Sequence, residues 1–300
     1  MLKIAYHSCY KHPLKENHRF PMVKYELIPI QLVRENICKE ENFFSPDKID
    51  DDLVLLTHDL AYYQKLCALD LSKKEARPIG FPLSEALVNR EKIIVNGTVE
   101  SAIYALQHKV SLNIAGGTHH AFSNKAEAFC LLNDQAIAAN YLLTNQLVKK
   151  ILIVDLDVHQ GNGTAEIFKN NNSVFTLSFH GKNNYPFKKE ISDLDVEFED
   201  GTKDALYLEK LIEVLPKIIQ DVNPDFIFYL SGVDIIKNDK LGKLSLSIEG
   251  CQKRDEIVFK ECKKNKLPVQ VSMGGGYSSE LKEIIDAHVN TFRTANDIFF

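Results

Sequence analysis

Acidic and imidazole side chains alternate along residues 155–159, which read Asp-Leu-Asp-Val-His. Residues two apart on an extended strand point to the same side, so Asp155, Asp157 and His159 can share one face. Neighbouring carboxylates repel each other unless a cation lies among them. A carboxylate and an imidazole at this spacing can bind one zinc ion, with a third ligand from elsewhere. We therefore expect a metal at this segment.

Asp234 is the natural third ligand, because it follows a later apolar run, DFIFYLSG. Three protein ligands leave a coordination position open for water and a substrate carbonyl, as in catalytic zinc sites. Asp239 and Asp193 are nearby alternatives, but Asp239 lies past the strand end and Asp193 lies in a charged loop. We interpret both as solvated. The alternative interpretation of residues 155–159 is a loop in which the aspartates cap backbone amides and bind no metal.

Short runs of β-branched and aromatic residues predict the elements that position these groups. Most runs lack in/out alternation, as expected of strands buried on both faces of a parallel sheet. The predicted strands are 3–6, 111–115, 150–157, 173–179, 225–232 and 268–273. Apolar residues at helical spacing predict helices over 91–109, 134–149, 204–221 and 249–266. This alternation indicates an α/β fold, a doubly wound, mostly parallel sheet with helices on both faces.

The chain shows no repeat or linker, so we interpret residues 1–300 as a single domain. Residues 40–90 are irregular and are expected to form loops and short helices over one end of the sheet. Ligands of open α/β sheets bind beyond the carboxyl ends of the strands. Five predicted strands run into polar motifs: GGTHH (116–120), VHQGNGT (158–164), His180, Val233-Asp234 and GGGY (274–277). Their convergence predicts the rim of an active site.

Bulk composition excludes several classes of protein. The chain has 300 residues, 45% of them hydrophobic and 26% charged, and a net charge of −5 without a long basic run. Direct binding of nucleic acid is therefore not expected. Six cysteines without a CxxC pair are typical of a reducing compartment. No signal-peptide core and no apolar run of ~18 residues is present, so we expect a cytoplasmic protein that does not bind membranes.

Several motifs together resemble a known family over nearly the whole chain. They are GGTHHAF, AFCLLND, VDLDVHQGNGT, Tyr185-Pro186, SGVDIIKNDKLGKLSLS, KRDEIVF and GGGY. The chain resembles the arginase/histone-deacetylase fold, and most closely the class IV histone deacetylases because of HQGNG and DKLGKLSLS. Arginase-like enzymes bind two manganese ions through further aspartates. Here those positions are Gln160-Gly161-Asn162 and Ile235-Ile236, which disfavours a binuclear site.

The resemblance implies roles for individual residues. It assigns one zinc ion to Asp157, His159 and Asp234, and proton transfer to the histidine pair, with His120 as base and then acid and His119 acting through charge. It implies that Tyr277 donates a hydrogen bond to the substrate carbonyl. The residues expected to form the acyl-lysine tunnel are Gly117, Phe129, Tyr185, Leu241 and Gly275.

The same resemblance implies supporting groups. Asp155 is expected to orient His119, and Asn162 to face His120 where many class I members have aspartate. A structural potassium ion is expected at Asp155, Ser178 and the carbonyls of Asp157 and His159. Arg19 aligns with an arginine that lines an internal acetate channel in some members. Ala128 and Thr118 depart from the usual glycine and apolar residue, which bears on acyl-chain preference.

These features predict a zinc-dependent hydrolase that removes acetyl or longer acyl groups from lysine side chains of proteins or peptides, acting as a monomer. One alternative is a deacetylase of small amides such as acetylpolyamines, which an acidic gate in the tunnel would favour; no such insertion is evident. The other is a non-catalytic protein that binds acyl-lysine. That alternative predicts a lost ligand or tyrosine, yet Asp157, His159, Asp234, His120 and Tyr277 are all present.

Overall fold

Eight strands form one sheet in the computed structural model, which describes residues 1–16 and 18–300. The strand order is β2-β1-β3-β8-β7-β4-β5-β6, and every pairing is parallel. The strands are β1 (Lys3–Ala5), β2 (Phe43–Phe44), β3 (Val110–Asn113), β4 (Ile151–Asp155), β5 (Val174–Gly181), β6 (Leu194–Phe198), β7 (Phe226–Leu230) and β8 (Val269–Ser272). The predicted doubly wound sheet is confirmed.

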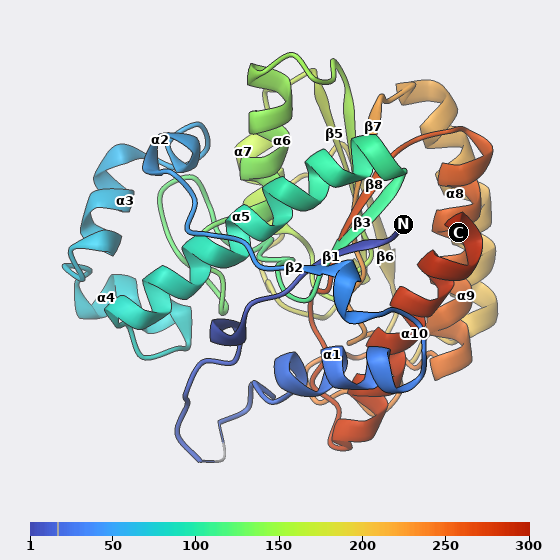
Figure 1. The fold of residues 1–300 in the computed structure, drawn as a ribbon, viewed down its shortest axis with the longest axis horizontal. Helices are drawn as coiled ribbons and strands as arrows, with labels where there is room; N and C mark the ends of the chain where they lie inside the picture. The colour runs from blue at the N-terminus through green and yellow to red at the C-terminus, as the bar shows by residue number, and fades with distance from the viewer. Residues whose placement is uncertain (17) are drawn as a thin grey trace.

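Helices cover both faces of this sheet (Figure 1). On one side lie α5 (Glu85–His108), α6 (Asp134–Thr144) and α7 (Asn162–Phe168). On the other side α8 (Asp204–Val222) and α10 (Leu281–Phe299) pack against α9 (Ile248–Lys264), while α1 (Lys24–Arg34) contacts α10. The four central strands β3, β8, β7 and β4 are buried along their whole length, as their unbroken apolar runs predict.

Several elements were not predicted from the sequence. The edge strand β6 reads Leu-Asp-Val-Glu-Phe and is only partly buried, so it lacks the apolar run used to recognise strands. Helix α1 contains Pro29, a residue normally excluded from helix interiors. Helix α5 begins before the predicted residue 91, because Ser84 caps it through a 3.2 Å hydrogen bond from the Leu87 amide.

Residues 40–84 form loops and short elements, as predicted, whereas residues 85–90 belong to the long helix α5. The short elements are α2 (Asp51–Val54), α3 (Leu60–Cys67) and α4 (Lys73–Ala76), with β2 adding a two-residue edge to the sheet. Among the described residues, no helix has the length and apolar character needed to cross a bilayer.

Neighbouring strands deliver the polar motifs to one edge. Because β3, β8, β7 and β4 are adjacent, the loops that follow them lie side by side. These loops hold residues 114–120, 273–277, 231–234 and 156–160. The order of the strands in the sheet, and not their order in the chain, therefore assembles the site.

Candidate metal centre and acyl tunnel

Asp157, His159 and Asp234 form a cluster with metal-binding geometry. One potential ligand atom from each lies within 4.8 Å of the other two, and all three residues are buried. His159 Nδ1 is 3.0 Å from Asp157 Oδ1 and 3.2 Å from Asp234 Oδ2. No other cluster of this kind occurs in the part of the chain that the structure describes. Two carboxylates and one imidazole are a donor set that suits a single zinc ion.

The charge of this cluster also fits a bound cation. Burial and the neighbouring Asp157 raise the pKa of Asp234 to about 7. Although burial acts to lower it, the hydrogen bonds with Asp157 and Asp234 raise the pKa of His159 to about 10. The two buried carboxylates therefore favour positive charge beside them. A divalent ion would supply that charge.

The local backbone differs from the strand geometry used to predict the ligands. Asp155 is the last residue of β4, whereas Asp157 and His159 lie in the turn that follows. The His159 amide donates to Asp157 Oδ1 at 2.9 Å, which folds the turn around the carboxylate. Asp157 also accepts from the Gly275 amide at 2.8 Å, and a side chain at Gly275 would overlap the two aspartates. The glycines of GGGY leave room for the cluster.

The adjacent histidines have different partners. Nδ1 of His119 lies 2.6 Å from Asp155 Oδ2, and Nδ1 of His120 lies 2.6 Å from Asn162 Oδ1. Burial lowers the pKa of His119, but the Asp155 carboxylate outweighs it and the net shift is upward. Burial and the charge of His119 hold the pKa of His120 well below its ordinary value. His120 is therefore the neutral member of the pair, suited to accept a proton.

Tyr277 is held beside the cluster by hydrogen bonds to a half-buried aspartate. Its amide donates to Asp239 at 2.5 Å, and Asp239 also accepts from the amides of Leu241 and Gly242 at 2.8 Å. The prediction that Asp239 is solvated is therefore wrong, because its carboxylate satisfies three backbone donors of the loop. Lys24, also not foreseen, is buried and donates to the Gly274 carbonyl at 3.2 Å. A single charged residue in a helix, such as Lys24, or in a loop, such as Asp239, does not reveal from the sequence which distant groups it will contact.

A cavity of about 650 Å³ leads to the cluster. The predicted tunnel residues all line it: Gly117, Phe129, Tyr185, Leu241 and Gly275. The rings of Tyr185 and His120 meet edge to face, with centroids 5.1 Å apart. Ala128 and Phe129 have φ of 45° and 69°, and their amides donate to the carbonyls of Pro78 and Ile79 at 2.9 and 2.7 Å. These bonds hold the aromatic wall in place.

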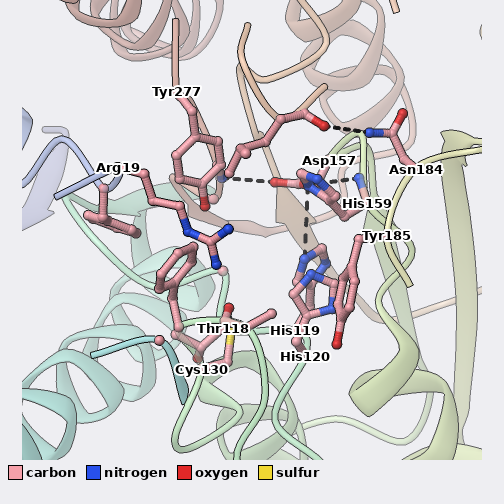
Figure 2. A pocket seen from close by; sticks show the side chains of 18 of the residues that line it. Arg19, Thr118, His119, His120, Cys130, Asp157, His159, Asn184, Tyr185 and Tyr277 are labelled. Carbon is pink, nitrogen blue, oxygen red and sulfur yellow. Dashed lines mark hydrogen bonds and ion pairs between the residues drawn. The ribbon is translucent and has the colours of Figure 1, made fainter. Parts of the chain in front are cut away.

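Arg19 is not an internal residue, so the acetate-channel prediction is wrong in its location. It is exposed, points into the mouth of the cavity in Figure 2, and has its guanidinium carbon 4.8 Å from the centre of the Phe129 ring. The buried arginine that lines the same cavity is Arg90. It donates to the Tyr10 carbonyl at 2.8 Å and is paired with Glu91. The adjacent Arg90 and Glu91 could not be predicted from the sequence to be buried beside the cavity, because such pairs are also common on exposed helix surfaces.

The other predicted supporting residues lie as follows. Asp155 and Ser178 face each other in the register of β4 and β5, and Ser178 Oγ is 3.0 Å from His180 Nδ1. This placement is compatible with a potassium site, which stays a prediction. Thr118 turns its hydroxyl to the Leu132 carbonyl and Asp134 at 2.5 and 2.8 Å. The Thr118 hydroxyl therefore stabilises the loop that carries His119 and His120, and is not directed at an acyl group.

Sequence comparison identifies the family. Residues 18–292 match the model of the histone deacetylase domain. The chain belongs to the histone deacetylase family. An uncharacterised protein of Picosynechococcus is 39% identical over 99% of both chains. Histone deacetylase 2 of Arabidopsis thaliana is 28% identical over 93% of this chain and 75% of its own.

Solved structures of the family share the fold. A histone deacetylase homologue complexed with SAHA superposes with a TM-score of 0.85 at 24% identity, covering 99% of this chain and 84% of that one. The HD domain of HDA15 superposes with a TM-score of 0.83 at 20% identity, covering 99% of this chain and 89% of that one. The chain is therefore a hydrolase of the histone deacetylase family. Its assignment to class IV stays a prediction.

Proposed function

We propose that this protein is a zinc-dependent hydrolase that removes acetyl or longer acyl groups from lysine side chains of proteins or peptides. The observation that carries the proposal is the neutral His120 beside the Asp157–His159–Asp234 cluster, at the inner end of an aromatic-walled cavity. Such a cavity fits the apolar stem of lysine, and the inner groups supply the requirements of amide cleavage. The single donor cluster in the described chain supports one zinc ion.

Zinc held by these ligands would polarise the amide carbonyl and acidify a water molecule. Neutral His120 takes the proton of the attacking water and passes it to the departing lysine amine. His119, paired with Asp155, keeps positive charge close to the reacting oxygen. Burial and the nearby aspartates hold the pKa of Tyr277 well above its ordinary value, so its hydroxyl stays protonated and donates to the carbonyl oxygen as charge develops.

A deacetylase of small acetylated amines remains the second candidate from the same site. The test is a panel of acetyl-lysine peptides, longer acyl-lysine peptides and acetylpolyamines, assayed on zinc-loaded enzyme. Turnover of the peptides supports the proposal, and turnover of acetylpolyamines alone supports the second candidate. Tyr277→Phe should lower kcat by about 10²–10³ if its hydroxyl stabilises the reacting oxygen. Absence of turnover with every substrate would refute the hydrolase assignment.

A further inference from the structure

Positive charge gathers around the mouth of the cavity although the chain as a whole carries −5. The residues with full charges that line the cavity are Arg19, Arg77, Arg90, Lys240, Lys243 and Asp157. Asp157 belongs to the metal cluster, so the described lining offers no other carboxylate. Arg90 is buried with its charge matched by Glu91. The remaining four cations are exposed and face an incoming substrate.

Three of these cations have no acidic partner among the described residues. Lys243 lies 3.8 Å from Asp200, whereas no described carboxylate lies within 4.0 Å of Arg19, Arg77 or Lys240. Surface cations are commonly matched by nearby carboxylates, and a group of unmatched ones creates a positive potential focused by the cleft. The mouth therefore presents a positive potential to an approaching substrate.

The unmatched cations come from three separate segments that border the opening. Arg77 precedes the Pro78 and Ile79 carbonyls that accept hydrogen bonds from Ala128 and Phe129, and Arg19 stacks on the Phe129 ring. Lys240 lies in the segment after β7, where its amide donates to the Tyr277 carbonyl at 3.3 Å. An acyl-lysine side chain that enters the cavity therefore brings its neighbouring residues to a rim with cations from all three segments.

We propose that the mouth selects acyl-lysine flanked by acidic residues, with Arg19, Arg77 and Lys240 binding the flanking carboxylates. This inference rests on the proposed function and names its substrate class. The carboxylates belong to the peptide and not to the acyl group, because Arg90, the buried arginine of the cavity lining, is already paired with Glu91. The same charges repel acetylpolyamines, whose free amines are cationic, and so disfavour the second candidate.

The test uses short peptides with acetyl-lysine between two glutamates, two alanines or two lysines, together with succinyl-lysine between alanines and acetylspermidine. In wild-type enzyme we expect kcat/KM to be about tenfold or more higher for the glutamate peptide than for the lysine peptide, and this ratio to fall as salt rises. Arg19→Gln, Arg77→Gln and Lys240→Gln should each lower the ratio by roughly two- to fivefold. Arg77→Glu should lower it further.

Lys253→Gln is the matched control, because Lys253 is exposed on α9 and does not line the cavity. The ratio of kcat/KM for the glutamate peptide to that for the lysine peptide should be the same in this variant as in wild type. Turnover of the alanine peptide without preference for glutamate, or a ratio unaffected by all three substitutions, overturns the inference and leaves the proposed function standing. A preference for succinyl-lysine that Arg19→Gln abolishes, or for acetylspermidine, also overturns it. Failure to cleave any substrate refutes the proposed function itself.

Discussion

His120 Nδ1 and Asn162 Oδ1 are 2.6 Å apart in a buried pair that contains no carboxylate. A neutral amide stabilises the imidazolium form of His120 less than an aspartate would. Together with burial and the positive charge of the neighbouring His119, this leaves the pKa of His120 well below 6.5. The base is therefore free of its proton across the neutral range.

Asn162→Asp should move the acidic limb of the pH profile upward. A carboxylate at Oδ1 raises the pKa of His120, so a larger fraction is protonated at any given pH and activity below neutrality falls. We expect the midpoint of kcat/KM on the acidic side to rise by about one to two pH units. An unchanged profile in an enzyme that still binds its metal would show that His120 is not the base.

Asp234→Asn should remove the metal. The substitution replaces one of three ligands, so we expect less than one zinc per chain by elemental analysis and loss of deacylation. Stripping zinc from wild type with a chelator should also lower Tm, because a ligand that binds only the folded state stabilises it, by about 2.7 kcal/mol at a hundredfold excess over Kd. Asp193→Asn should keep both zinc and activity, since Asp193 is exposed and outside the cluster. The reverse pattern would contradict the ligand assignment.

Gly80→Ala should disturb the tunnel wall. Gly80 has φ +77°, and a Cβ there would lie 2.8 Å from Phe129 Cε1. We expect about 1–2 kcal/mol of destabilisation from the left-handed backbone and an increase in KM as Phe129 shifts. Gly201→Ala is a matched control, because Gly201 has φ +79° with no atom within 4 Å of its Cβ position. Equal effects of the two substitutions on KM would rule out the contact with Phe129 as the cause.

His58 should make stability depend on pH. Burial lowers its pKa to about 4, and its Nε2 accepts from the Asn133 amide at 3.0 Å. The unfolded chain binds a proton near pH 6.5, so this contribution is complete above that value and is lost as pH falls toward 4. The loss amounts to roughly 3 kcal/mol. The free energy of unfolding of His58→Gln should decline less steeply over that window, and parallel curves would disprove the linkage.

Continuous apolar runs were enough to predict the buried central strands, because a strand covered on both faces must be apolar throughout. Edge strand β6 and helix α1 escaped prediction because their residues are only partly buried or include a helix-disfavouring proline. The cluster of Asp157, His159 and Asp234 was predictable because each residue follows a strand. Arg90 and Lys24 were not, because the partners that place them lie far away in the sequence.

Two backbone hydrogen bonds tie the Phe129 wall to the carbonyls of Pro78 and Ile79, far earlier in the chain. Substitutions in that earlier segment can therefore widen, narrow or tilt the wall while the metal ligands and proton-transfer groups stay untouched. Natural selection can act on which acyl groups enter without risking the chemistry that cleaves them. Related enzymes with the same catalytic groups can therefore differ in acyl-group specificity through a loop that does not contact the reacting atoms.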